Sequence, residues 1–188
     1  SFLVPSFFGA TSAYAASSLS QRFDKIASSI ISDVTTHKIG FIITNTTTSV
    51  GSVTIEFCSN TPIIEDPCTF PIGFSASSTT ISNQTGETGF SLHPSSTAHK
   101  IVLTRVPVNP TGVAATYDFS NITNPSANGT YFVRIRTYSS IDASGLDIQN
   151  GGVVIHINDA LNVSGEVPPY INFCVAVAIT SFDCSTAN

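Results

Sequence analysis

The stretch Gly129–Ser139, with the sequence GTYFVRIRTYS, decides the fold class of this chain. Its side chains alternate between an apolar face and an aromatic or basic face: Tyr131, Val133 and Ile135 on the first, and Phe132, Arg134, Arg136 and Tyr138 on the second. Such alternation is typical of a strand in an antiparallel sheet with one buried face. The stretch therefore predicts a half-buried strand.

Segments of similar character recur along the chain at spacings near ten residues. They cover residues 17–34, 38–44, 52–58, 75–82, 100–106, 115–119, 153–157, 161–167 and 171–179. For residues 17–34 the spacing also permits a helix, and we favour a strand because the later segments are strand-like. The turn-like connection NTTTSVG predicts that 38–44 and 52–58 form a hairpin, and NQTGETG (83–89) predicts a turn. We expect an all-β fold, an immunoglobulin-like Greek-key β-sandwich over residues 17–188, without the buried Trp of true immunoglobulin domains.

The composition favours an exported structural or adhesive protein. Charged residues make up 10% of the 188 residues, against about 25% in an ordinary soluble domain, whereas Ser and Thr occupy about 50 positions. The net charge is −5 and the seven basic residues are scattered, which argues against nucleic-acid binding. No apolar run approaches the roughly 18 to 20 residues that a membrane span needs.

The four cysteines form two pairs of equal spacing, Cys58 with Cys68 and Cys174 with Cys184. Three connectivities are possible, and the equal spacing favours two local disulfides over bridges that join the pairs. The spacing does not resemble that of a zinc site, so we expect no metal. Disulfides would place the protein outside the reducing cytosol.

Residues 1–16, SFLVPSFFGATSAYAA, carry no charge and end in a small-x-small pattern that a signal peptidase could cut. The alternative is an apolar extension strand that pairs with another subunit, and we favour this alternative. The interface would then include Phe2, Val4, Phe7, Phe8, Ala10, Ser12 and Tyr14. Pro5 cannot donate to a sheet, so the paired strand should begin after it.

Candidate catalytic chemistry is weak. The histidines His37, His93, His99 and His156 lack a G-x-S-x-G or HExxH motif, and we expect neither an enzyme nor a cofactor. We interpret the acidic residues Glu65, Asp66, Asp142 and Asp147 as solvated loop residues rather than calcium ligands. Five N-x-S/T sequons, barely more than chance gives, are possible glycosylation sites: Asn45, Asn83, Asn121, Asn128 and Asn162.

Four stretches carry a resemblance to a known group of proteins: GETGF (86–90), NITNP (121–125), GTYFVRI (129–135) and VPPYINFC (167–174). From about Leu19 to Cys184 the chain resembles a family of secreted β-sandwich proteins of small-genome bacteria, and its plan looks like that of donor-strand, pilin-like fibre subunits. Members of that family often continue past the last cysteine. The resemblance implies export to the cell surface, and the fibre analogy implies that the N-terminal extension of one subunit completes a sheet of the next.

The leading hypothesis from the sequence is therefore a subunit of an extracellular, cell-surface filament that polymerises with other copies of itself. The alternative is a monomeric surface adhesin or carbohydrate-binding module that uses its loops or the face of Phe132, Arg134 and Tyr138 to contact a host or neighbouring cell.

Overall fold

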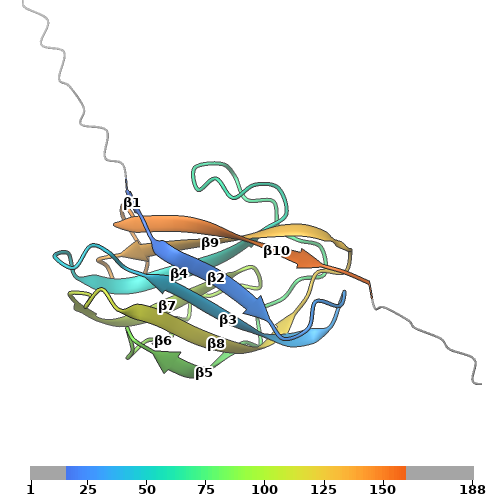
Figure 1. Cartoon of the computed structure of the whole chain (residues 1–188), viewed down its shortest axis with the longest axis horizontal. Coiled ribbons are helices and arrows are strands. Elements are labelled where there is room, and N and C mark those ends of the chain that lie inside the picture. Colours follow the sequence, from blue (N-terminus) through green and yellow to red (C-terminus); the bar gives the residue numbers. More distant parts are fainter. Residues whose placement is uncertain (1–15, 160–188) are drawn as a thin grey trace, which may run out of the picture.

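The computed structural model describes residues 16–159, and every regular element in this range is a β-strand (Figure 1). Six strands form sheet A, in the order β1 (Ser17–Ser18), β10 (Gln149–Ile157), β9 (Gly129–Tyr138), β4 (Val50–Cys58), β7 (Lys100–Val108) and β6 (Ser91–Leu92). Four strands form sheet B, in the order β2 (Ser20–Ile26), β3 (Val34–Ile42), β8 (Ala114–Thr123) and β5 (Thr80–Thr85).

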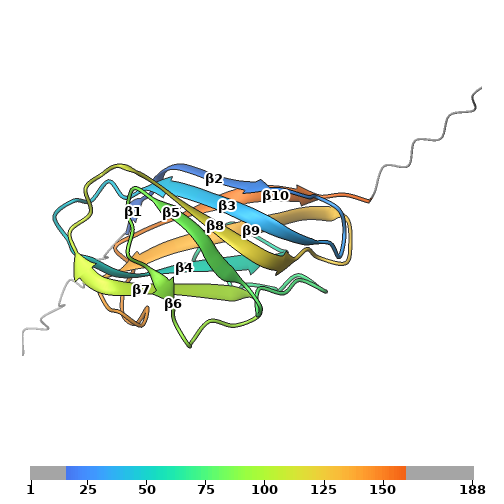
Figure 2. The same ribbon diagram turned by 90° about the horizontal axis from the view of Figure 1, so that it is seen from below.

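The two sheets face each other as the layers of an immunoglobulin-like sandwich, which confirms the predicted fold class (Figure 2). All pairings between neighbouring strands are antiparallel except that of the short β1 with β10. The strand interpretation of residues 17–34 is correct, since β1 and β2 occupy half of that segment and the structure has no helix there.

The core lies between the sheets and follows the predicted alternation. Tyr131, Val133 and Ile135 of β9 are buried, as their period of two requires. They meet buried side chains of β3 and β4 that include Phe41 and Phe57. Full burial of an aliphatic or aromatic side chain of this size contributes about 1.5 to 3 kcal/mol, so this central layer is the main source of cohesion between the sheets.

The hairpin predicted for residues 38–44 and 52–58 is wrong. β3 lies in sheet B between β2 and β8, whereas β4 lies in sheet A between β7 and β9. Both strands are central, so each is fully paired within its own sheet and the connection between them crosses from one layer to the other. Turn-forming residues permit a hairpin, but they do not specify which strands pair.

The boundary of the strand predicted for residues 75–82 also differs. β5 runs from Thr80 to Thr85, so it includes the first residues of the segment expected to be a turn, 83–85, and Ser75 contributes only an isolated bridge to Thr123. Gly86 and Gly89, both with positive φ, turn the chain after β5.

Several predictions fall outside the described residues. These are the interface residues from Phe2 to Tyr14, the strands over 161–167 and 171–179, the pair Cys174 and Cys184, and the sequon at Asn162. Across residues 16–159, no helix long and apolar enough to cross a membrane is found.

Candidate functional site

The loop of residues 59–73 connects β4 to the core residue Phe74 and covers part of the outer face of sheet A. A disulfide joins Cys58 at the end of β4 to Cys68, which confirms the predicted local pairing. The side chain of Asn60 ties the two sides of the loop together, because its Nδ2 donates to the carbonyl of Pro67 and its Oδ1 accepts from the N–H of Thr69. The loop is therefore held closed by a covalent bond and by an amide bridge.

Two arginines of β9 hold this loop against the sheet. Arg134 is 1% exposed, and its Nε and Nη2 donate to the carbonyl of Thr61 at 3.1 and 3.0 Å, while its Nη1 donates to the carbonyl of Asp66 at 2.7 Å. Arg136 Nη2 donates to the carbonyl of Ile64 at 2.6 Å. The guanidinium groups thus donate to three carbonyls of the loop in charge-assisted hydrogen bonds.

This arrangement contradicts the use of the Phe132, Arg134 and Tyr138 face as an open ligand surface. Arg134 and Tyr138 are buried and Phe132 is half-buried. What stays open is a polar hollow of about 80 Å³, lined by Thr54, Glu56, Lys100, Arg136, Tyr138 and Ala143. The sequence predicted a strand face correctly, but the loop that covers it comes from a distant segment.

One side of the sandwich, where β2 meets β10, is closed. The N–H of Leu19 donates to the carbonyl of Asn150, and the N–H of Asn158 donates to the carbonyl of Ser29. Between these two points Arg22 of β2 reaches across, and its Nε donates to the carbonyl of Gly152 at 3.2 Å. Backbone bonds and a charged side chain therefore occupy this side.

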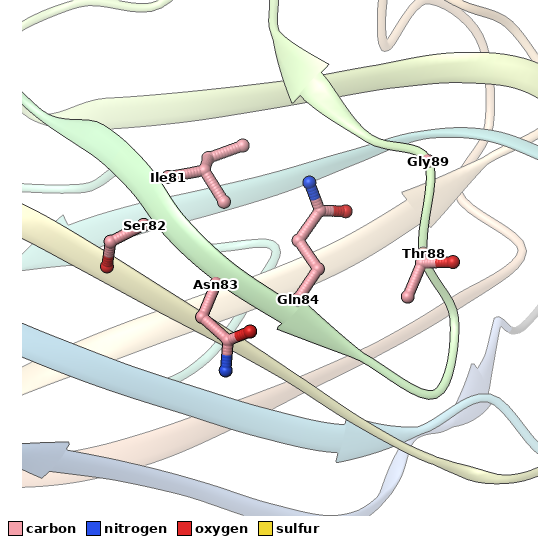
Figure 3. Close-up of a pocket in the computed structure, with 6 residues that line it drawn as sticks. All are labelled: Ile81, Ser82, Asn83, Gln84, Thr88 and Gly89. Atoms are coloured by element: carbon pink, nitrogen blue, oxygen red, sulfur yellow. The ribbon is translucent and has the colours of Figure 1, made fainter.

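The opposite side, where β5 is the outer strand of sheet B, is open. β5 pairs with β8 on one side, and no described strand pairs with its other side. A hollow of about 360 Å³ lies between β5 and the segment that leads to β6, lined by Ile81, Ser82, Asn83, Gln84, Thr88 and Gly89 (Figure 3). Four consecutive residues of one strand edge thus line this hollow.

The amide of Gln84 bridges the two sheets beside this hollow. Its Nε2 donates to the carbonyl of Phe90 at 2.6 Å, and its Oε1 accepts from the N–H of Phe90 at 3.0 Å. These two hydrogen bonds reproduce the pattern of a hydrogen-bonded residue pair between antiparallel strands. The side chain thereby joins the edges of the sheets at one point and leaves the rest of the β5 edge free.

A buried ion pair fixes the connection after β5. Glu87 Oε2 lies 3.1 Å from Arg105 Nη2, and Glu87 Oε1 accepts from both the N–H and the hydroxyl of Thr111. Burial alone would raise the pKa of the Glu87 carboxyl, but the bonds from Thr111 and Arg105 together hold this pKa below its usual value. Burial raises the pKa of Tyr117, whose hydroxyl donates to the carbonyl of Glu87.

Sequence reasoning missed this ion pair. An arginine within the apolar strand Lys100–Val108 was a usable signal, because a charge inside such a segment is seldom fully buried unless it is paired. The partner was not predictable, since Glu87 stands 18 positions away in a segment read only as a turn.

Two histidines contact a hydroxyl without an acid on the ring, since His93 Nδ1 lies 2.7 Å from Ser95 Oγ and His156 Nδ1 lies 3.2 Å from Thr130 Oγ1, and the other two are packed against aromatic rings. His37 is fully buried, its Nδ1 lies 2.8 Å from Asp24 Oδ2, and its ring packs edge-on against Phe57, which leaves Nε2 without a hydrogen-bond partner. His99 stacks on Phe70 with ring centroids 4.4 Å apart. Among the described residues none of these arrangements contains a Ser, His and acid constellation.

The acidic residues considered for calcium make local contacts. Asp142 accepts from the N–H and the hydroxyl of Ser144, which hold its pKa below the usual value, and Asp147 accepts from the side chain of Asn150. Glu56 lies within 4.8 Å of the sulfurs of Cys58 and Cys68, but these sulfurs are bonded to each other and provide no thiolate.

The four sequons within the described range differ in accessibility. Asn83, Asn121 and Asn128 are exposed. Asn45 is half-buried, and its side chain caps the turn that follows by accepting from the N–H groups of Thr47 and Thr48. The Nδ2 of Asn83 donates to Asp118 and that of Asn128 donates to Asp159, so these two amides are exposed but bonded, and Asn45 has a structural role.

No protein-family model matches the chain, and no curated protein matches it. Solved structures that resemble its fold include the following three. One is BslA, described as a bacterial hydrophobin, with 15% identity and a TM-score of 0.46 over 79% of this chain and 100% of that chain. Another is a cohesin module from a Clostridium perfringens family 33 glycoside hydrolase, with 10% identity and a TM-score of 0.38 over 77% of this chain and 100% of that chain. The third is an uncharacterized protein from Nocardia farcinica with an immunoglobulin-like fold, with 14% identity and a TM-score of 0.36 over 78% of this chain and 90% of that chain.

Proposed function

We propose that this protein is a structural subunit of an extracellular filament, in which residues 1–16 of one subunit add as a strand to the sandwich of the next. The observation that carries the proposal is the place where the chain enters the fold. The sheet begins at Ser17 in β1, the outermost strand of sheet A, so the uncharged segment before it is attached at an edge of the sandwich.

The composition of the segment supports an intermolecular role. An added strand gains backbone hydrogen bonds along its length, and its apolar side chains gain burial. At about 25 cal/mol per Å² of apolar area, the burial of a few aromatic side chains such as Phe7, Phe8 and Tyr14 would contribute several kcal/mol per junction before the costs of ordering. The closed disulfide supports a location in an oxidising, extracellular compartment.

The second candidate, a monomeric adhesin or carbohydrate-binding module, has less support. Its aromatic and basic face is covered by the disulfide loop, and only the small hollow beside Lys100 and Arg136 is open there. Two cations and one carboxylate, Glu56, line that hollow, so its net charge of about +1 would favour an acidic group.

Deletion of residues 1–16 tests the proposed function. The full chain should form polydisperse, elongated assemblies in solution and in electron micrographs, and the truncated chain should stay near the mass of a single subunit. Filaments of the truncated protein that look like those of the full chain would overturn the proposal. A monomeric full chain that binds acidic glycans in a saturable way would instead support the adhesin.

A further inference from the structure

We infer that the outer edge of β5 is the acceptor for the N-terminal segment of a second copy of this chain. The inference rests on the proposed filament function, and it identifies the surface of the sandwich that the incoming strand would occupy. The two sides of the sandwich differ in how they are protected against strand addition.

The edge at β2 is protected by charge. Exposed edge strands invite pairing with other chains, and natural proteins prevent this with charged side chains, inward-pointing charges, prolines or bulges. β2 contains Arg22, Asp24 and Lys25, and its register with β3 is interrupted by a bulge. Arg22 and Asp24 turn inward, to Gly152 and to His37, so an incoming strand would meet polar groups that are already paired.

The edge at β5 lacks most of these protections. Its sequence, TISNQT, has no charge and no proline, although a bulge interrupts its register at Ile81 and Asn83. Every second residue of an edge strand turns its N–H and C=O away from its partner strand. The hollow of about 360 Å³ that Ile81, Gln84 and Thr88 line lies beside β5 (Figure 3).

The residues at this edge suit an uncharged occupant. Ile81 is half-buried and packs against the core at the rim of the hollow. Residues 1–16 are uncharged as well, so their side chains would cover Ile81 without burying a charge. A charged segment would lose its hydration at this site, and β5 and its hollow offer no charge to compensate for that loss.

The lengths are compatible. A strand of six residues such as β5 spans about 20 Å. Residues 6–16, which follow Pro5, can span up to about 36 Å when extended, so they can pair along β5 and still bridge the junction between two subunits.

The geometry also favours a chain of subunits over a closed pair. β1 and β6 are the two outer strands of sheet A, and β5, the outer strand of sheet B, lies next to β6. β1 and β5 are therefore on opposite sides of the sandwich. The segment therefore leaves one side of the sandwich and would bind the opposite side of a neighbour. Such a heterologous contact repeats in one direction and produces an open filament unless a rotation closes it.

The test adds charge to one edge and uses the other edge as the matched control. In the full chain, Ser82→Lys with Thr85→Lys places two lysines on β5, and Gln21→Lys with Ala27→Lys places two lysines on or next to β2; all four side chains are exposed. Light scattering should show assemblies for the wild type and for the β2 variant, and a mass near 19.7 kDa for the β5 variant. Assembly of a β5 variant with unchanged thermal unfolding would overturn the inference.

A second measurement does not depend on the folding of the lysine variants. A photo-crosslinking residue in place of Phe8 in the full chain, in a mixture of isotopically light and heavy protein, should give crosslinks from one chain to residues 80–85 of another. Crosslinks confined to other surfaces, or found only within single chains, would overturn the inference.

The two proposals can fail separately. Assemblies that require residues 1–16 but tolerate the β5 lysines would leave the filament function standing and reject β5 as acceptor. A full chain that stays monomeric would reject both.

Discussion

Glu87 Oε2 lies 3.1 Å from Arg105 Nη2, and both side chains are almost completely excluded from solvent, 4% and 6% exposed respectively. This pair connects the turn after β5 to β7, and Thr111 extends it to the middle of the β7–β8 connection. Together with the Gln84 amide it is a polar contact that joins segments beside the open edge, and because it is ionic it makes stability depend on pH.

We expect the stability of the fold to fall in acid through Glu87. The pKa of Glu87 in the folded state lies below its ordinary value of 4.5, so the ionised carboxylate stabilises the fold above pH 4.5, and this contribution is lost as the pH falls through the folded-state pKa. Thermal unfolding measured from neutral pH to below pH 4.5 should show this decline. Glu87→Gln should be less stable at neutral pH and should decline less in acid, and parallel profiles for the two proteins would contradict the assignment.

Arg134→Met should loosen the disulfide loop. The substitution leaves the carbonyls of Thr61 and Asp66 without their donors, and we expect a loss of about 2 to 3 kcal/mol of unfolding free energy. Arg136→Met removes a single bond to Ile64 and should cost about 1 kcal/mol, which makes it the matched control. Chemical denaturation measures both, and equal costs would show that the burial of Arg134 is incidental.

Removal of the described disulfide should weaken the fold without abolishing it. Cys58→Ser with Cys68→Ser opens a loop whose ends are 10 residues apart, for which loop-closure entropy predicts a loss of about 2 to 3 kcal/mol. Because Arg134 still binds the loop, native circular dichroism should persist at room temperature. A double variant that is unfolded under these conditions would show that the arginine contacts depend on the disulfide.

Assembly should be nearly insensitive to salt. Residues 1–16 and β5 contain no charged side chain, so screening between about 0.1 M and about 1 M salt has little to act on at this contact. Light scattering over this range of salt concentration measures the assembly of the wild type and, for comparison, of the β2 lysine variant. Dissolution of the assemblies at high salt would indicate that a charged surface, such as Lys100 and Arg136, makes the contact.

Local pattern predicted most of the strands because their side chains report directly on burial. The alternation in Gly129–Ser139 placed Tyr131, Val133 and Ile135 in the core before any partner strand was known. The spacing of Cys58 and Cys68 likewise predicted their pairing, because a short loop keeps the two residues near each other.

Partner choice was not predictable from the same patterns. The turn chemistry between 38–44 and 52–58 suggested a hairpin, but β3 and β4 pair with strands that are distant in the sequence. The second face of β9 looked like an open aromatic and basic surface, and it is covered because the carbonyls of residues 61–66 meet Arg134 and Arg136.

The sequence by itself determined that this protein is an all-β, disulfide-bonded and sparsely charged chain that follows an uncharged apolar segment. Those properties depend on residues that are close together or on composition. Only the tertiary structure decided which strand edges are closed and which is open, because the protection of an edge depends on contacts such as Arg22 with Gly152, whose residues stand 130 positions apart. Edge exposure is thus a property of strand order, and strand order is set by packing between distant segments.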